Sequence, residues 1–243
     1  KRIAEARISW LDEEIKKVKG EASLLKTKLM NHEYNVPSDA QLPNSWVWAS
    51  FLTASQTVVD CHNKTAPYQA RGIPLIRTTN IRNGKIILEE IKYVSDETYA
   101  YWSRRCPPEA GDILFTREAP MGQAAIIPKG TRMCMGQRTM LIRVFSQFLD
   151  NKFLLYAILS PSFQRRLEQG AVGTGVKHLR VGDVETLAVP VPPIAEQKEI
   201  MVRLESQMSM ISEAEAEVEK SARRAEHIRQ SILKKAFSGQ LTY

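Results

Sequence analysis

The stretch VPVPPIAEQKEI, residues 189–200, separates two kinds of sequence in this chain. Before it, prolines interrupt short apolar runs. After it, no proline occurs and apolar residues recur at helical spacing. Proline fixes its own φ and has no backbone N–H, so the run from Pro190 to Pro193 stiffens the chain and disfavours a helix there. We therefore predict that a sheet ends within this stretch and that a long helix begins at its end.

The residues after this junction carry a seven-residue apolar repeat. The repeat consists of Leu204, Ile211, Val218, Ala225 and Ile232, with Met201, Met208, Ala222 and Ala236 at the companion positions. Glu215 and Arg229 interrupt the companion row. An average spacing of about 3.5 residues is typical of helices that supercoil around a partner helix. Residues 194–243 are therefore predicted to form a coiled-coil helix.

The start of the chain has the same kind of pattern. Steps of three and four residues alternate along the series Ile8, Leu11, Ile15, Val18, Ala22, Leu25 and Leu29. The series predicts a spacer helix over residues 1–34, antiparallel to the last helix if the two lie side by side. Roughly 35 to 40 residues at about 1.5 Å each would form a rod of about 50 to 60 Å. A helical hairpin that only stabilises the domain accounts for the pattern equally well.

Residues 35–193 differ in composition and are predicted to form one α+β domain. Runs typical of strands lie at residues 73–77, 85–88, 112–116, 124–127 and 140–144, and runs typical of short helices at 151–159 and 161–169. Asn83-Gly84 predicts a hairpin turn, because both residues tolerate positive φ. The aromatic residues expected in the core are Trp46, Trp48, Phe51, Phe115, Phe153, Tyr156 and Phe163. The predicted fold is a globular domain with a twisted, mostly antiparallel sheet and short helices, flanked by two long helices in an antiparallel coiled coil.

The composition favours a negatively charged partner. The 243 residues include 34 Lys and Arg against 27 Asp and Glu, a formal net charge of +7, which attracts polyanions such as nucleic acid. Cys61, Cys106 and Cys134 lie far apart without a Cys-x-x-Cys pair, which favours a reducing, cytoplasmic setting. No apolar stretch approaches the roughly 18 residues of a membrane span, so we expect no membrane partner.

The sequence lacks motifs for the chemistry expected near DNA. It has no glycine-rich cofactor loop, no polar residue before Pro-Pro-aromatic as a base-flipping methyltransferase needs, and no Gly-Lys-Ser or Gly-Lys-Thr loop of a motor. Asp183 followed by Glu196 and Lys198 has a nuclease-like spacing. However, an acidic residue in the first turn of a long helix is expected from the helix dipole alone. We expect a non-catalytic chain without cofactor or metal, with a nuclease as a remote alternative.

Side chains that reach base edges and phosphates are concentrated in four segments, residues 77–85, 116–118, 136–139 and 174–178. Arg reads guanine with two hydrogen bonds, Asn and Gln read adenine, and Lys, Thr and backbone N–H groups bind phosphates. Each segment follows or links predicted strands, so one side of a sheet can present them all. A polar surface turn is the alternative for any single segment. The residues predicted to contact double-stranded DNA are Arg77, Thr78, Thr79, Asn80, Arg82, Asn83, Lys85, Thr116, Arg117, Gln137, Arg138, Thr174, Lys177 and His178.

Five longer strings of the chain are LPNSWVWASF (42–51), IPLIRTTNIRNGKI (73–86), GDILFTREAPMGQAAIIP (111–128), GVKHLRVGDVETLAVPVPPIAEQKEI (175–200) and IRQSILKKAFSGQLT (228–242). These strings resemble those of the specificity subunits of type I restriction-modification enzymes. They occur in the family's order and span nearly the whole chain. Where the family has Thr or Ser, Arg, any residue and then Gly, this chain has Thr116-Arg117-Glu118-Ala119, so Ala119 replaces a usual glycine.

The resemblance implies a target-recognition domain at residues 35–193 that reads one half of a split DNA sequence, with antiparallel helices setting the gap between the halves. It also implies docking to modification subunits, which bind S-adenosylmethionine and methylate adenine, and to motor and nuclease restriction subunits. The chain opens at Lys1 within a helical pattern and holds one such domain. We therefore expect either the second half of a full subunit or a half-subunit that pairs with its own copy. A coiled-coil assembly scaffold whose globular domain binds protein is the alternative function.

Overall fold

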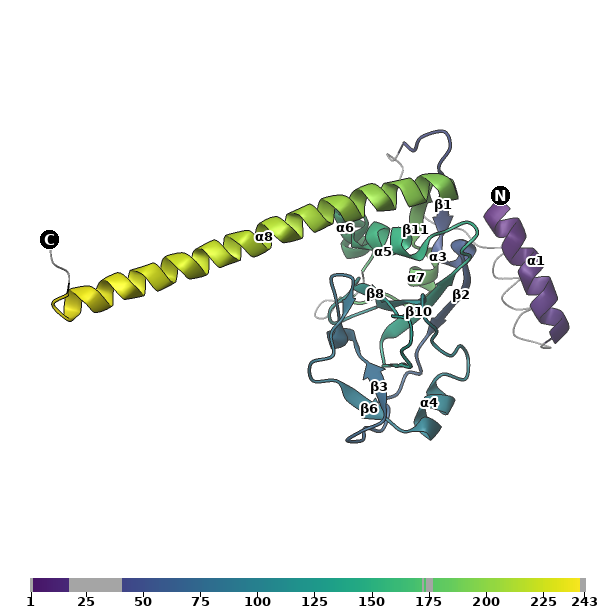
Figure 1. Cartoon of the computed structure of the whole chain (residues 1–243). Helices are drawn as coiled ribbons and strands as arrows, with labels where there is room; N and C mark the ends of the chain where they lie inside the picture. Colours follow the sequence, from purple (N-terminus) through teal and green to yellow (C-terminus); the bar gives the residue numbers. More distant parts are fainter. Residues whose placement is uncertain (1, 18–40, 172, 174–176, 241–243) are drawn as a thin grey trace. The chain divides into compact units, whose positions relative to one another are not determined.

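A computed structural model describes residues 2–17, 41–171, 173 and 177–240 of the chain (Figure 1). The chain divides into two compact units, and the boundary falls between Lys198 and Glu199. The first unit holds all the strands and short helices together with α1 and the first turn of α8 (Ile194–Phe237). The second unit consists of the rest of α8 and the residues after it.

The largest sheet of the first unit has four strands and is antiparallel throughout. Its order is β2-β10-β7-β8, with β2 (Ser55–Asp60), β10 (Thr139–Val144), β7 (Ile113–Thr116) and β8 (Ala124–Ile126). All four residues of β7 are buried, as are the first four of β10. A strand covered on both faces reads as a continuous apolar run, which is why both strands are visible in the sequence.

Three smaller sheets complete the described part of the domain. They are β1 (Val47–Ser50) with β11 (Ala188–Val191), β6 (Lys92–Val94) with β3 (Ile73–Ile76) and β9 (Cys134–Met135), and the hairpin of β4 (Ile81–Arg82) and β5 (Lys85–Ile86). Only β3 and β9 pair in parallel among these described strands. The mostly antiparallel character is confirmed, but the strands form four sheets where the sequence suggested one.

Short helices cover one end of the domain. They are α3 (Phe51–Ala54), α5 (Asn151–Leu159), α6 (Pro161–Gly170) and α7 (Val181–Thr186), whereas α4 (Asp96–Trp102) lies with β3 and β6 at the other end (Figure 1). Asp150 caps α5 by accepting hydrogen bonds from the backbone N–H groups of Lys152 and Phe153, at 2.9 and 3.0 Å. A capping carboxylate satisfies N–H groups that have no partner within the helix. The predicted bounds of α5 and α6, residues 151–159 and 161–169, agree with the structure to within one residue.

The aromatic residues expected in the core are largely buried. Phe51 lies between Phe115 and Phe163, with ring centroids 6.0 and 5.8 Å away. Phe153 is also buried. Trp46, Trp48 and Tyr156 are half-buried at the edge of this core. Their apolar ring surface therefore packs inward and is not spread out as a stacking platform.

The first turn of α8 is fixed to the domain by polar side chains. Gln197 is fully buried and donates hydrogen bonds to the carbonyl oxygens of Phe148 and Pro192, both at 2.8 Å. Its own carbonyl oxygen accepts from the backbone N–H of Asp150 at 2.8 Å. These bonds satisfy both ends of a buried amide, which would otherwise be costly to bury. The proline-rich junction thus leads directly into the helix, as the sequence predicts.

Helix α1 (Arg2–Lys17) packs against the domain. Leu11 is buried against Leu52 of α3 with Ile8 beside it, and the rings of Trp10 and Phe145 lie 6.1 Å apart. Ile8 and Leu11 were expected to face a partner helix, and this part of the prediction is wrong, because α3 covers them. The remainder of the predicted spacer helix lies outside the described residues.

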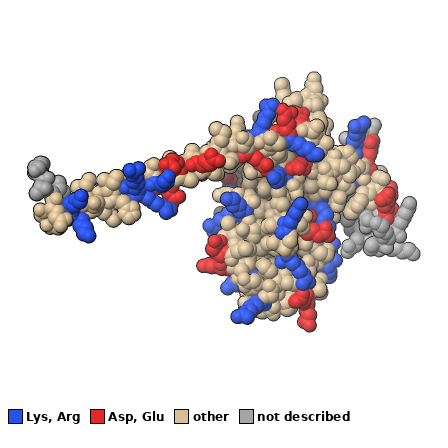
Figure 2. Space-filling view, viewed as in Figure 1, with Lys and Arg blue, Asp and Glu red and all other residues tan. Residues whose placement is uncertain are grey.

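The second unit, residues 199–237 of α8, is divided by charge. Residues 199–219 contain six Glu and one Arg, whereas residues 220–235 contain six Lys or Arg and one Glu. Figure 2 shows the red and blue side chains following one another along the helix. Ile211, Val218 and Ile232, which belong to the predicted seam, are exposed.

Candidate nucleic-acid interface

The polar segments predicted to read DNA converge on the turn between β7 and β8, residues 117–123, which we call the central turn. Thr78, in the short 3-10 helix Thr78–Asn80, donates a hydrogen bond to the carbonyl oxygen of Ala119 at 2.9 Å. In the β4–β5 hairpin, the backbone N–H of Asn83 donates to Gln123 at 2.8 Å. Both contacts join the predicted segment 77–85 to this turn.

The segments 136–139 and 174–178 meet the central turn at Glu118. The Glu118 carboxylate forms an ion pair with Nε of Arg138 at 2.7 Å. The backbone of Glu118 forms an antiparallel bridge with His178, and the N–H of Leu179 donates to the Arg117 carbonyl oxygen at 3.1 Å. The described residues of three predicted segments therefore lie around the turn that contains most of the fourth, although up to about a hundred residues separate them in sequence.

Strained backbone shapes the central turn. Ala119 has a φ of 47°, in the left-handed region that glycine adopts without steric cost. A glycine, which the resemblance led us to expect at this position, would adopt the same conformation without strain. Gly122 has a φ of 77°, and a Cβ there would lie 2.6 Å from Cδ1 of Leu167. The turn therefore packs directly on α6.

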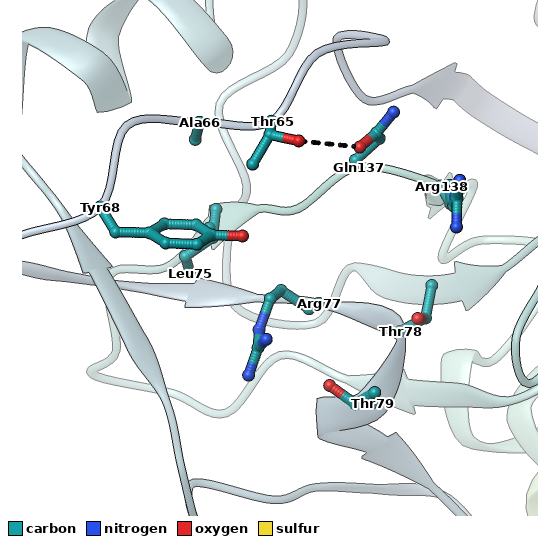
Figure 3. Close-up of a pocket in the computed structure, with 9 residues that line it drawn as sticks. All are labelled: Thr65, Ala66, Tyr68, Leu75, Arg77, Thr78, Thr79, Gln137 and Arg138. Carbon is teal, nitrogen blue, oxygen red and sulfur yellow. Dashed lines mark hydrogen bonds between the residues drawn. The ribbon is translucent and has the colours of Figure 1, made fainter.

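A shallow hollow of about 160 Å³ lies beside the central turn (Figure 3). Its lining includes five of the residues predicted to contact DNA, namely Arg77, Thr78, Thr79, Gln137 and Arg138. Gln137 is held in place by Thr65, whose hydroxyl donates to it, and by Asn63, which accepts from it, both at 3.3 Å. The hollow is lined by donors and acceptors that a base edge or a phosphate could meet.

Gly136 brings two of these segments together. A Cβ at Gly136 would lie 2.7 Å from the Ile76 carbonyl oxygen and 3.0 Å from Cα of Arg77. The close approach follows the parallel pairing of β9 with β3, and the Gly136 N–H donates to the Ile76 carbonyl oxygen at 2.8 Å. Only glycine allows this contact without displacing backbone. The residues Gln137 and Arg138 are thereby placed next to Arg77.

Three of the predicted DNA-contacting side chains are buried and hold the turns instead. Asn80 is 2% exposed and donates to the carbonyl oxygens of Ile87 and Glu89, at 3.0 and 3.4 Å, while it accepts from the Arg77 N–H. Thr116 is fully buried and accepts from the Gln123 N–H at 2.9 Å. Thr78 is buried as well. Their polar atoms are occupied within the fold, so these three are corrected from contact residues to residues that shape the site.

The other predicted residues reach the surface to different degrees. Thr79, Arg82, Asn83, Lys85, Arg138 and Lys177 are exposed, whereas Arg77, Arg117, Gln137 and His178 are half-buried. The guanidinium groups of Arg77 and Arg117 donate to the carbonyl oxygens of Glu90 and Leu179, at 3.0 and 2.9 Å. Thr174 lies outside the described residues. Figure 2 shows basic and acidic side chains intermixed on the face in view, so the surface depends on placed side chains more than on a uniform positive field.

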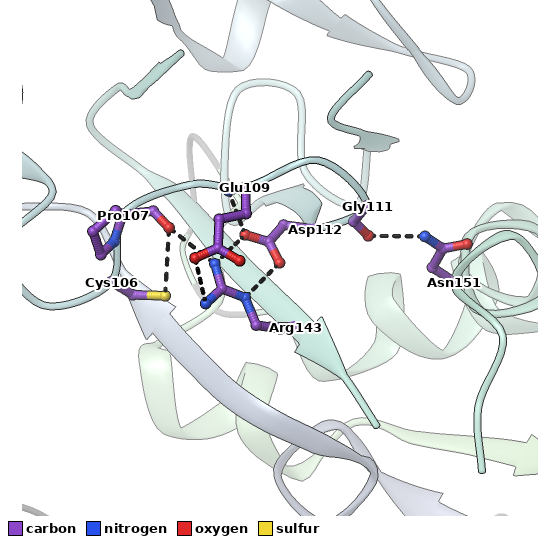
Figure 4. Close-up of polar contacts among 7 residues, drawn as sticks. All are labelled: Cys106, Pro107, Glu109, Gly111, Asp112, Arg143 and Asn151. Carbon is purple, nitrogen blue, oxygen red and sulfur yellow. Dashed lines mark hydrogen bonds and ion pairs between the residues drawn. The ribbon is translucent and has the colours of Figure 1, made fainter. Parts of the chain in front are cut away.

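An ion-pair cluster holds the strands that carry the central turn (Figure 4). Arg143 on β10 donates to both carboxylate oxygens of Asp112, which precedes β7, at 2.8 and 2.7 Å. The hydrogen bonds that Arg143 donates to Asp112 raise the pKa of Arg143, so the guanidinium stays charged. Arg143 also donates to the Pro107 carbonyl oxygen at 2.9 Å, and its Nη1 lies 3.3 Å from Oε1 of Glu109. The pair fixes β7 against β10 at the end opposite the central turn.

Sequence reasoning missed Glu118 and the loop that holds Gln137. Glu118 lies in one of the four predicted segments but was not among the residues predicted to contact DNA. Asn63 and Thr65 carry no local signal, since each lies more than 70 residues from Gln137. Such pairings are set by the packing of β3, β9 and β10 and have no counterpart in local sequence.

Both acidic residues considered for a nuclease have structural partners. The Asp183 carboxylate accepts the backbone N–H of Arg180 at 2.9 Å and so caps α7, and Glu196 accepts the Trp46 indole N–H at 2.9 Å. In the described part of the chain, no three His, Cys, Asp or Glu side chains are grouped to hold a metal ion. Nor does that part contain a helix with the length and apolar character to cross a membrane.

Comparison with known families explains this arrangement. A family model described as the type I restriction modification DNA specificity domain matches residues 60–220, which is more than half of the chain. The chain belongs to this family. The matched residues of the specificity domain include the central turn, the hollow and the first half of α8.

Curated relatives of this specificity domain are subunits of restriction enzymes. The chain is 30% identical over 171 residues to the EcoBI specificity subunit of Escherichia coli, covering 70% of the chain and 36% of that relative. It is 23% identical over 215 residues to the EcoKI specificity subunit of Escherichia coli strain K12, covering 84% of the chain and 45% of that relative. The chain thus spans less than half the length of these two relatives.

Solved structures share the fold of the specificity domain. The HsdS subunit from Thermoanaerobacter tengcongensis aligns with a TM-score of 0.58 and 19% identity, over 82% of this chain and 51% of that chain. A chain from a study of complex assembly and conformational transition of the type I R-M system aligns with a TM-score of 0.59 and 21% identity, over 99% of this chain and 56% of that chain. The mixed helices, the mostly antiparallel sheets and the long last helix are therefore the architecture of this family.

Proposed function

We propose that this chain is the non-catalytic part of a type I restriction-modification complex that reads one half of a bipartite DNA target. The observation that carries the proposal is the convergence of three polar segments on the central turn, which contains most of the fourth, in a chain that belongs to the specificity-domain family. Phosphate contacts fix the position of a protein on a duplex, and base contacts select the sequence. A single turn that gathers both kinds of side chain suits this task.

Exposed, half-buried and buried residues have different proposed roles in DNA binding. Arg82, Lys85 and Lys177 are exposed cations suited to phosphates. Gln137 and Arg138, beside the hollow, are suited to base edges. The buried Asn80 and Thr116 keep the turns in place, so that the contacting side chains are arranged before DNA binds. Pre-arranged side chains lose less conformational entropy on binding.

The long helix is proposed to pack in an antiparallel coiled coil and to set the distance between two recognition domains. The seam residues Ile211, Val218 and Ile232 are exposed, which supports a partner helix covering them. The partner helix belongs to the other half of a full specificity subunit or to a second copy of this chain. Modification subunits, which carry S-adenosylmethionine, and motor and nuclease subunits are proposed to dock on the assembly in the cytoplasm.

A selection from random DNA duplexes tests this function. The chain is assembled with its modification subunits, and bound duplexes are sequenced after selection at two salt concentrations. We expect a short enriched half-site, and an affinity that falls with salt by about 0.9 logarithmic units per tenfold salt for each phosphate contact. The alternative of a scaffold whose globular domain binds protein predicts no enriched sequence. Equal recovery of all duplexes by the assembled complex therefore excludes the proposed function.

A further inference from the structure

We propose that Arg138 reads a guanine in the target half-site through its two terminal nitrogens, and that Glu118 is the residue that positions it. The inference rests on the proposed function and names one specificity-determining contact within it. It is carried by the ion pair between Nε of Arg138 and the Glu118 carboxylate at 2.7 Å, at an exposed position on the rim of the hollow.

The ion pair holds the Arg138 side chain at the rim of the hollow. Nε of Arg138 lies 2.7 Å from the Glu118 carboxylate, and the Arg138 side chain is still 49% exposed. Within the described residues, no other side chain is found to pair with its terminal nitrogens Nη1 and Nη2. Reading guanine requires two parallel N–H donors directed at O6 and N7 in the major groove. An arginine anchored by an ion pair at Nε keeps both terminal donors for a base.

The backbone conformation of Arg138 is constrained as well. Its φ is 69°, a left-handed conformation that costs an arginine free energy and that glycine would adopt freely. The turn is closed by the Thr139 hydroxyl, which donates to the Gly136 carbonyl oxygen at 2.6 Å, and by the Arg117 N–H, which donates to the Arg138 carbonyl oxygen at 3.0 Å. A strained position that keeps a long, exposed cation points to a role for the side chain outside the fold.

Other arginines of the site are less suited to base reading. Arg77 and Arg117 are half-buried and direct guanidinium nitrogens to backbone carbonyl oxygens of the domain. Arg82 is exposed on the β4–β5 hairpin and has no ion pair among the described residues. A freely moving cation suits a phosphate, which accepts hydrogen bonds from many directions. Arg138 combines an ion-paired Nε with an exposed end.

The neighbouring carboxylate also distinguishes a base from a phosphate. Glu118 compensates the charge of Arg138 at 2.7 Å, so the pair attracts a second anion less strongly than a lone arginine would. The terminal N–H groups can still donate to the neutral acceptors of a base. Guanine is the base that offers two acceptors side by side in the major groove. The geometry therefore favours guanine over a phosphate as the ligand of Arg138.

Random-duplex selection on the assembled complex tests the inference with single variants. Wild type is expected to enrich a guanine at one position, and Arg138→Ala to reduce that preference by about 5- to 150-fold while the other positions stay selected. Arg138→Lys keeps the charge but lacks the planar fork, and should lose the same preference with an unchanged salt slope. Arg132→Ala, which removes an exposed arginine paired with Asp96, is the matched control and should keep the wild-type motif.

Glu118 variants test positioning. Glu118→Ala should weaken the preference at the same guanine, Glu118→Gln should weaken it as well because a neutral amide cannot form the ion pair, and Glu118→Ala should have no further effect in an Arg138→Ala background. An unchanged motif in Arg138→Ala overturns the inference. If binding then weakens equally on all duplexes and the salt slope falls by about 1, Arg138 contacts a phosphate. A wild-type complex that enriches no sequence at all refutes the proposed function instead.

Discussion

Replacing Arg143 with alanine should strongly destabilise the domain beneath the central turn. Arg143 donates hydrogen bonds to both carboxylate oxygens of Asp112, at 2.8 and 2.7 Å. Asp112 is 3% exposed. In Arg143→Ala the Asp112 carboxylate would stay buried. Among the described residues, it would still accept a hydrogen bond from the backbone N–H of Glu109 at 2.8 Å. A buried charge left without its counter-ion is one of the larger single losses a fold can suffer.

The magnitude follows from these contacts. A hydrogen bond to a charged group contributes about 1.5 to 3 kcal/mol, and removing one partner of a buried ion pair costs about 3 to 5 kcal/mol. The Arg143 side chain is 23% exposed, so water replaces part of what is lost. We therefore expect a decrease of about 3 kcal/mol in the free energy of unfolding. For a domain of this size, that decrease lowers the Tm by about 6 to 12 °C.

Urea unfolding of the full chain, followed by far-ultraviolet circular dichroism, measures this difference. Arg132→Ala is the matched control, because Arg132 also pairs with one aspartate, Asp96, but at the surface. Exposed ion pairs contribute little to stability, so this variant should unfold almost as the wild type does. Equal unfolding midpoints for Arg143→Ala and Arg132→Ala would refute the claim that the buried pair anchors β7 against β10.

Three further changes should alter stability in defined directions, each measured by urea unfolding. Ala119→Gly should raise the free energy of unfolding by about 1 kcal/mol, because residue 119 has a φ of 47°. Gly136→Ala should lower it by about 1 to 3 kcal/mol, because the new Cβ would lie 2.7 Å from the Ile76 carbonyl oxygen. Raising the pH from about 9 to 12 should lower the free energy of unfolding. Burial raises the pKa of Cys61 and of Cys134 from 9.0 to about 12, so these thiols ionise in the unfolded chain first.

Each of these changes has a control. Gly170→Ala should have little effect, since a Cβ there meets nothing within 4 Å, and a loss equal to that of Gly136→Ala would contradict the close-approach argument. A destabilised Ala119→Gly would mean that strain at residue 119 is absent. The double variant Cys61→Ala and Cys134→Ala should have a shallower pH dependence above about pH 9. An unchanged pH dependence of stability in the double variant would mean that other groups cause the loss above about pH 9.

Local signals were sufficient for the ends of helices and for turns. Asn83 and Gly84 have φ values of 47° and 83°, as the hairpin prediction requires. Ser160 caps α6, which opens on Pro161. These features depend on the conformational preferences of one or two neighbouring residues. The sequence therefore places them correctly without knowledge of the fold.

Long-range pairing could not be predicted in the same way. The parallel contact of β3 with β9 joins Leu75 to Cys134, and the ion pair of Arg138 with Glu118 depends on how β7 and β10 are aligned. Nor could residue type separate contact from support. Asn80 belongs to a type that reads adenine, and it is also a type that closes turns. The tertiary structure, which buries it, decides between the two roles.

Charge reversal of the proposed reading surface tests the central claim most directly. One variant carries Glu at the exposed positions Arg82, Lys85 and Arg138, and a matched variant carries Glu at Arg104, Lys129 and Arg132, which are exposed elsewhere on the domain. The Kd of the assembled complex for its selected duplex is then measured at several salt concentrations. The first variant should bind about 100-fold or more weaker with a reduced salt slope, and the second should bind within a few-fold of the wild type. Equal losses in both variants, or no loss in the first, would contradict the assignment of the central turn and its neighbours to DNA.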